Sequence, residues 1–248
     1  MSLPFDLTPF TTAYLALVLF GAAFVRGYSG FGFSALVVTA ASLVTNPLNL
    51  VPVVIFCEFL MTFQQWREIG AHVDWARVRG LMLGALIGVP LGLWLITQVP
   101  VDATRAVIAV YVLAMCAVLL RGWKLQRAQG GAGHAAVGTF AGLANAVGMG
   151  GLPVATYFTA QAMPAQVFRA TLIAYFAGLD LFTFPFLWWH GLVSFDTGVV
   201  VLAGLPLMAL GIWLGGRHFL SAAPQEFRRF AIVLLAVLAM LGLGKAIL

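Results

Sequence analysis

"FVRGYSGFGFSAL", residues 24–36, lies in a chain that is otherwise almost continuously apolar, and it contains one arginine and three glycines. Glycine is a poor helix former, and an arginine inside a bilayer is costly unless the protein supplies a partner. The stretch therefore predicts that a membrane helix is broken here and that the break serves a purpose.

The composition places the chain among integral membrane proteins. Of the 248 residues, 62% are hydrophobic and 8% are charged, whereas soluble domains carry about 25% charged residues. The apolar stretches have the length of membrane helices, and the alternating segments of a transmembrane barrel are absent. We expect an all-α polytopic membrane protein. The net charge of +5 comes mostly from loop residues, so the lipid bilayer is the expected partner and nucleic acid is not.

Ten apolar segments follow one another along the chain. The first two segments, and the sixth and seventh, are short or interrupted by glycine. Merging the short pairs would leave eight spans, so we expect about 8–10 helical segments. They cover residues 10–26, 31–45, 48–65, 80–97, 103–120, 135–146, 150–161, 165–189, 197–216 and 225–244.

The two halves of the chain repeat the same series of features. GFGF at 30–33 matches GMGG at 148–151, and GVPLGLWL at 88–95 matches GLPLMALGIWL at 204–214. Between these motifs each half has a proline turn and then a helix with one acid, Glu58 or Asp180. The ordered series predicts two transmembrane repeats, residues 1–128 and 129–248, with the broken or short helices at the centre.

Lysine and arginine concentrate in alternate loops. Loops 46–48, 98–102 and 190–196 are poor in both. Cytoplasmic loops are enriched in basic residues, so the pattern puts both termini outside the cytoplasm and inverts the two halves, as in many secondary transporters. The basic loops contain Arg67, Arg77, Arg79, Arg121, Lys124, Arg127, Arg217, Arg228 and Arg229.

The two glycine-rich breaks predict one central anion site. Irregular backbone persists in a membrane only where protein or water satisfies it, and the free N–H groups of broken helix ends attract anions. Arg26 adds a fork-shaped positive charge that suits oxyanions. The candidate substrate-binding residues are Arg26, Gly27, Tyr28, Ser29, Gly30, Gly32, Ser34, Asn145, Gly148, Gly150 and Gly151.

Arg26 and the glycines also suit purely structural roles. The long Arg26 side chain can reach a membrane interface, and the glycines can serve close helix packing. Arg169, shortly after Pro164, is expected at an interface for the same reason.

GYSGFGFSAL at 27–36, GLANAVGMGGLPVATYF at 142–158 and the duplicated plan resemble the TauE/SafE family of sulfite and organosulfonate exporters. The resemblance covers nearly the whole chain. It implies a permease of the bacterial inner membrane that exports a small sulfur-containing anion from the cytoplasm.

Glu58 and Asp180 are the two acids that lie away from the ends of predicted helices. Glu58 lies about ten residues into its helix, or roughly 15 Å at about 1.5 Å per residue, close to the bilayer centre. Asp180 holds the corresponding place in the second half. Buried carboxyl groups can bind and release protons, so the two acids are candidates for proton coupling. The alternative is that each makes a structural contact with a neighbouring helix.

The leading hypothesis is a secondary transporter that works by alternating access. An anion channel and a membrane-embedded enzyme are the alternatives. Cys57 and Cys116 lie far apart in apolar segments, and all four histidines fall in predicted loops or at helix ends. We therefore expect no metal site, no cofactor and no catalytic residues.

Overall fold

The computed structural model describes residues 3–122, 124–125, 130–161, 163–219 and 224–247, and these residues form ten α-helices and no strand. The predicted all-helical class is confirmed. The helices are α1 (Pro9–Ser29), α2 (Phe33–Ser42), α3 (Pro47–Ile69), α4 (Trp75–Ile96), α5 (Val101–Arg121), α6 (Gly131–Asn145), α7 (Gly151–Thr159), α8 (Ala165–Trp189), α9 (Phe195–Phe219) and α10 (Pro224–Ile247).

The described helices differ in length. Six of them are long and apolar enough to cross a membrane, namely α1, α3, α4, α5, α8 and α9. In contrast, α2 has 10 residues and α7 has 9, and a membrane-spanning helix needs about 20. The chain is thus a multi-pass membrane protein in which two short helices accompany the long ones.

The first apolar segment forms a longer helix than expected. α1 continues to Ser29 and so holds Arg26 in its last turn. The break itself is short: Gly30 and Gly32 have φ angles of 81° and 95°, a region that glycine adopts at little cost. Gly27 stays helical, and a Cβ at this position would collide with the backbone of Ile212 in α9. Gly30 and Gly32 therefore turn the chain, whereas Gly27 permits a close helix contact.

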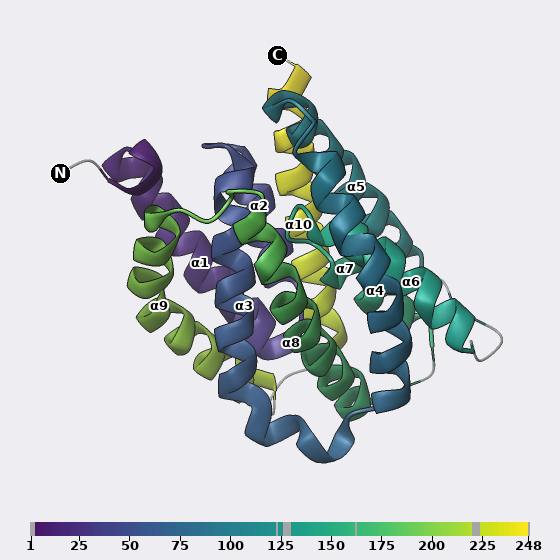
Figure 1. Ribbon diagram of the computed structural model, residues 1–248. Coiled ribbons are helices and arrows are strands. Elements are labelled where there is room, and N and C mark those ends of the chain that lie inside the picture. Colours follow the sequence, from purple (N-terminus) through teal and green to yellow (C-terminus); the bar gives the residue numbers. More distant parts are fainter. Residues whose placement is uncertain (1–2, 123, 126–129, 162, 220–223, 248) are drawn as a thin grey trace.

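The helices pack in pairs that combine the two halves of the sequence. The closest partners are α4 with α6, α1 with α9, α5 with α10 and α3 with α8. If α1 to α5 are matched in order with α6 to α10, exchanging the halves turns the α1–α9 pair into the α6–α4 pair. Both chain termini lie at one end of the molecule, and the α3–α4 connection lies at the other (Figure 1).

Glycines bring the backbones of α4 and α6 together. Four glycines of α4 recur every four residues at positions 80, 84, 88 and 92, and all of them face α6. A Cβ on Gly84 would collide with the carbonyl oxygen of Ala135, and a Cβ on Gly92 would lie 2.7 Å from that of Leu143. Small residues at this spacing are what lets membrane helices approach closely.

The α1–α9 contact is built in the same way. A Cβ on Gly211 would lie 2.7 Å from the carbonyl oxygen of Phe20, and a Cβ on Gly215 would collide with that of Phe24. Glycine-lined contacts therefore join α1 to α9 and α4 to α6, and each contact links the first half of the chain to the second.

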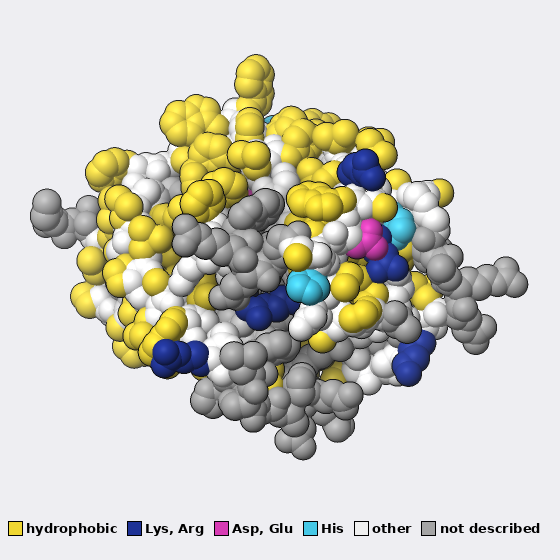
Figure 2. All heavy atoms as spheres, turned by 90° about the horizontal axis from the view of Figure 1, so that it is seen from below, with side chains coloured by type: hydrophobic (Ala, Val, Ile, Leu, Met, Phe, Trp, Pro, Cys, Tyr) yellow, Lys and Arg dark blue, Asp and Glu magenta, His cyan; other side chains and the backbone are white. Residues whose placement is uncertain are grey.

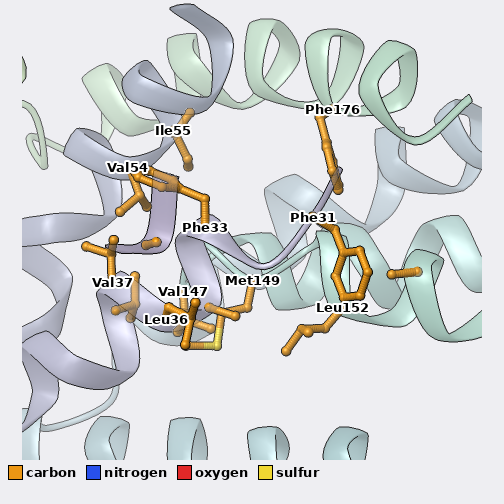
Figure 3. Close-up of a cluster of buried hydrophobic side chains, with 14 of the residues drawn as sticks. Phe31, Phe33, Leu36, Val37, Val54, Ile55, Val147, Met149, Leu152 and Phe176 are labelled. Carbon is orange, nitrogen blue, oxygen red and sulfur yellow. The ribbon is translucent and has the colours of Figure 1, made fainter. Parts of the chain in front are cut away.

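The two short helices lie in the core, next to the two breaks. All ten residues of α2 are buried. Phe31 and Phe33 from the first break lie in one apolar cluster with Val147 and Met149 from the second and with Leu152 of α7 (Figure 3). The two broken segments thus belong to one core, which apolar side chains fill.

We predict that Gly84→Ala destabilises the protein, because the added methyl group collides with the α6 backbone. Overpacking of this kind costs about 1–3 kcal/mol. Gly21→Ala in α1 is the matched control, since nothing lies within 4 Å of its added Cβ. Thermal unfolding in detergent should show a lower melting temperature for Gly84→Ala only. Equal melting temperatures for the two variants would contradict the close α4–α6 contact.

Candidate functional site

Arg26 is fully buried and is held by two residues of α3. Its Nη1 donates to the Glu58 Oε1 at 2.7 Å, and its Nη2 donates to the Thr62 Oγ1 at 3.1 Å. The guanidinium carbon lies 5.0 Å from the centre of the Phe176 ring. A buried cation needs such partners, because an isolated charge in an apolar interior costs many kcal/mol.

The spacing on α3 explains how one helix supplies both partners. Glu58 and Thr62 are four residues apart and therefore share one face of the helix. The Thr62 hydroxyl donates its own proton to the Glu58 carbonyl oxygen at 2.9 Å, which leaves its lone pairs for Arg26. Within the part of the chain that is described, the Arg26 Nε has no hydrogen-bond partner. The Nε–H group of the guanidinium is thus available to donate a further hydrogen bond.

The start of α2 contacts the same carboxylate. The hydroxyl and the backbone N–H of Ser34 both interact with Glu58, and α2 begins at Phe33. The positive end of a helix dipole favours an anion at this place. Arg26, the Ser34 hydroxyl and the α2 N-terminus were predicted to surround an anion, and the anionic group that they surround in the structure is Glu58.

Asp180 is a second buried acid near this group, and it is not paired. Its side chain is almost fully buried, and neither carboxylate oxygen has a hydrogen-bond partner among the described residues. Asp180 interacts electrostatically with both Glu58 and Arg26. We refer to Arg26, Ser34, Glu58, Thr62 and Asp180 together as the Arg26 cluster.

Asp180 does not match Glu58 residue for residue. The Thr183 hydroxyl donates to the Leu179 carbonyl oxygen at 2.7 Å, just as the Thr62 hydroxyl donates to that of Glu58. Matching Thr62 with Thr183 puts Leu179 opposite Glu58 and Asp180 one residue further on. One residue turns a side chain by about 100° around a helix, so the two acids point in different directions from their helices.

Asn145 takes the place in the second half that Arg26 has in the first. Its Nδ2 donates to the Thr183 Oγ1 at 2.9 Å, and its Oδ1 accepts the Gly150 N–H at 3.3 Å. Arg26 contacts Thr62 in the same way. In this structure the Asn145 amide therefore ties α6 to α8 and closes the turn that leads into α7.

The remaining candidates of the first half lie around the end of α1. Tyr28 is buried in the last turn of α1. The Ser29 hydroxyl donates to the carbonyl oxygens of Val25 and Phe31, both at 2.8 Å. These contacts hold the helix end and the break in shape.

The glycines of the second break make room for neighbouring side chains. A Cβ on Gly148 (φ 71°) would lie 2.9 Å from Val54, and one on Gly151 would lie 2.7 Å from the Phe176 ring. A Cβ on Gly150 would crowd Asn145, which its N–H contacts. The structure therefore brings Arg26, Ser34 and Glu58 together directly. Gly151 leaves room for the Phe176 ring, which packs against the Arg26 guanidinium.

Sequence reasoning missed Thr62, Phe176 and the role of Arg169 at the break. The motif Glu58-x-x-x-Thr62 and its counterpart, Thr183 four residues after Leu179, were readable from the sequence as a repeated threonine. Arg169 is half-buried, and its Nη2 donates at 3.3 Å to the Gly27 carbonyl oxygen at the end of α1. Nothing in the local sequence of Phe176 or Arg169 indicates these contacts.

A model of the sulfite exporter TauE/SafE family matches residues 15–241 of the chain. The chain belongs to the sulfite exporter TauE/SafE family. The matched range includes both breaks, Arg26, Glu58 and Asp180. Comparisons with curated proteins and with solved structures gave no match. Among the described residues, no group of three or more His, Cys, Asp or Glu could hold a metal ion.

We predict that Asn145 and Thr183 stabilise the fold as a pair. Asn145→Ala and Thr183→Val each remove the same hydrogen bond between α6 and α8, so the double variant should be less destabilised than the sum of the two. Thermal or denaturant unfolding in detergent should give a coupling energy of about 1 kcal/mol, as for other hydrogen bonds between membrane helices. Strictly additive effects would show that the bond does not stabilise the protein.

Proposed function

We propose that this protein is a secondary transporter that moves a small sulfur-containing oxyanion, of the sulfite or organosulfonate class, across the bacterial inner membrane. The observation that carries the proposal is the fully buried Arg26, which shares the Glu58 carboxylate with Ser34 in the N-terminal turn of α2, next to a helix break. Membership of the TauE/SafE family supports the substrate class.

The geometry around Arg26 suits an oxyanion. A guanidinium offers several N–H donors in a planar fork, which fits two oxygens of a carboxylate, a sulfite or a sulfonate. The Ser34 hydroxyl, the α2 backbone N–H and the Arg26 Nε, which has no partner among the described residues, add donors for further oxygens. A sulfonate or sulfite has three oxygens and can therefore use more of these donors than the Glu58 carboxylate does.

The mechanism we propose is alternating access of two inverted halves, residues 1–128 and 129–248. Two observations support this mechanism. The α1–α9 pair and the α6–α4 pair are equivalent when the two halves are interchanged, and both termini lie at one end of the molecule (Figure 1). The boundary at 128–129 itself lies outside the described residues. The apolar filling of the centre by Phe31, Val147 and Met149 favours a carrier that opens and closes over a permanently open channel.

For the orientation, we propose that the end with the α3–α4 connection faces the cytoplasm. Lys and Arg side chains lie across this end (Figure 2). Arg77 and Arg79 lie in the first turns of α4, and Arg121 ends α5. At the opposite end the charge of Arg105 is paired with Asp102 at 2.8 Å. The side chains of Arg67, Arg127, Arg228 and Arg229 lie outside the described residues.

We predict that a cysteine placed at exposed Gln98, between α4 and α5, reacts with a membrane-impermeant thiol reagent in whole cells. A cysteine placed at exposed Ala71, between α3 and α4, should react only after the cells are permeabilised. Cys57 and Cys116 are buried, so the parent protein provides the background. Labelling of Ala71→Cys in intact cells, without labelling of Gln98→Cys, would reverse the orientation.

We predict that Arg26→Ala weakens sulfite binding to the purified protein by about 30-fold or more, since truncating a buried charged partner costs about 2–5 kcal/mol. Arg26→Lys should weaken binding less, because a point charge replaces the fork. Calorimetry gives the affinity, and flux of sulfite into empty liposomes gives the transport rate. Exposed Arg121→Ala is the control.

Two results would contradict this assignment. Parental affinity in a folded Arg26→Ala protein would exclude Arg26 from the site. Chemical change of the substrate during the liposome experiment would favour an enzyme, whereas recovery of unchanged sulfite inside the liposomes supports transport.

A further inference from the structure

We propose that the Glu58 carboxylate occupies the substrate position in the empty transporter, and that a substrate anion can replace it on Arg26 only after Glu58 has taken up a proton. This inference rests on the proposed function. It adds a coupling residue, a proton stoichiometry and a preferred charge of the substrate.

The contacts of Glu58 are those that a bound anion would make. Its Oε1 accepts the Arg26 Nη1–H at 2.7 Å, and Ser34 interacts with the same carboxylate through its hydroxyl and its backbone N–H. The side chain is almost completely buried near the middle of α3. An anion at the break would need these same donors, so the carboxylate and the substrate compete for one position.

Charge balance decides which of the two anions is bound. Arg26 provides one positive charge in a site that excludes water, and a second unbalanced negative charge there would cost several kcal/mol. A substrate with one negative charge can therefore bind only if Glu58 gives up its own charge. Glu58 does this by binding a proton from water on the side from which the substrate enters.

The proton and charge balance of one cycle follows directly. When the anion binds, the Glu58 carboxylate gains a proton and forms an O–H bond. The Arg26 guanidinium then binds the substrate in place of Glu58. When the anion leaves on the other side, the O–H bond breaks, the proton goes to water, and Glu58 returns to Arg26. One proton and one monoanion thus cross together, and no net charge crosses the membrane.

Polar and charged groups from three other helices interact with the Glu58 carboxylate. Arg26 of α1, Ser34 of α2 and Asp180 of α8 all interact with its carboxylate, and Cys57 is its neighbour on α3. The helices α5 and α9 also pack against α3. Their described charged residues lie near the helix ends and are Asp102, Arg105, Arg121, Asp196 and Arg217.

Asp180 has a different role from Glu58. Neither of its oxygens has a hydrogen-bond partner in the described chain, so it is most stable there as a neutral acid that keeps its proton. A neutral Asp180 does not compete for Arg26. It also keeps the charge of the Arg26 cluster at one cation and one exchangeable anion.

A single balancing cation predicts the charge of the preferred substrate. Monoanions such as hydrogensulfite and alkylsulfonates match the one charge that Glu58 releases. Sulfate, a dianion of similar shape, would leave one negative charge without a partner. We therefore expect methanesulfonate to bind more tightly than sulfate.

The test uses methanesulfonate as the probe, because this strong acid stays a monoanion throughout the pH range and any titration belongs to the protein. Calorimetry on the purified parent between pH 5 and pH 9 should show weaker binding as the pH rises, by up to about tenfold per pH unit. In Glu58→Gln the affinity should be independent of pH and, at high pH, tighter than in the parent. Asp180→Asn is the matched control and should keep the parental slope.

Two further measurements separate coupling from folding. Glu58→Gln leaves Arg26 without its counter-charge, so this variant should be less stable than the parent when empty, and methanesulfonate should raise its melting temperature more than it raises that of the parent. In liposomes with a pH-sensitive dye inside, the parent should move one proton for each methanesulfonate. Glu58→Gln should exchange methanesulfonate without proton movement.

Several outcomes would overturn the inference. These are a parental pH slope that survives in Glu58→Gln, a slope lost in Asp180→Asn instead, a parent whose affinity does not change with pH, and sulfate binding as tight as that of methanesulfonate. Binding and flux without any role for Glu58 would leave the transporter proposal intact. If the parent neither binds nor moves methanesulfonate or sulfite, the proposed function fails and this inference fails with it.

Discussion

Inside hydrocarbon, every charge and every free backbone polar group must be satisfied by the protein itself, and this constraint explains the centre of the molecule. Arg26 lies in the last turn of a membrane helix, so its guanidinium needs an anion, and Glu58 provides one from the middle of α3. The break after Ser29 exposes the N-terminus of α2, and Ser34 there meets the same carboxylate. The Glu58 carboxylate thus provides a partner both for the Arg26 charge and for the free N-terminus of α2.

Glycine serves two separate purposes in this fold. Gly30, Gly32 and Gly148 have positive φ angles and turn the chain at the breaks. The glycines of α4 and α9 stay helical and let neighbouring backbones touch. The first use turns the chain at the breaks beside the polar centre, and the second holds the surrounding helices close together. A buried ion pair at the centre depends on both uses.

Much of the fold could be read from the sequence, because length and hydropathy decide which segments become membrane helices. The expected segment 165–189 coincides with α8, and nine further segments were found within several residues of their ends. Helix ends were less predictable: Gly27 looks like a helix breaker, yet α1 continues through it. The glycine there serves packing instead, because a side chain would collide with the backbone of Ile212.

The candidate site was harder to predict than the fold. Arg26, Ser34 and Glu58 were each identified from the sequence, but their mutual contact depends on how α1, α2 and α3 pack, which no local pattern specifies. Asp180 lies one residue beyond the position in α8 that corresponds to Glu58. This offset becomes visible only when the hydrogen bond from Thr183 to the Leu179 carbonyl oxygen is matched with that from Thr62 to the Glu58 carbonyl oxygen. The four-residue glycine spacing in α4 is visible in the sequence and is typical of a close helix contact, but it does not identify α6 as the partner.

The pairing of Arg26 with Glu58 within the first half has a consequence for biosynthesis. The packing partner of α1 is α9, which begins 186 residues later, at Phe195 against Pro9. At about 5–20 residues per second, the ribosome needs on the order of ten to forty seconds to make that stretch. During this time α1 must stay in the membrane without α9, and a bare arginine in its last turn would oppose insertion. Glu58 emerges after only 32 more residues, so the charge on α1 is neutralised by a neighbour that is already present, long before the helix finds its permanent place.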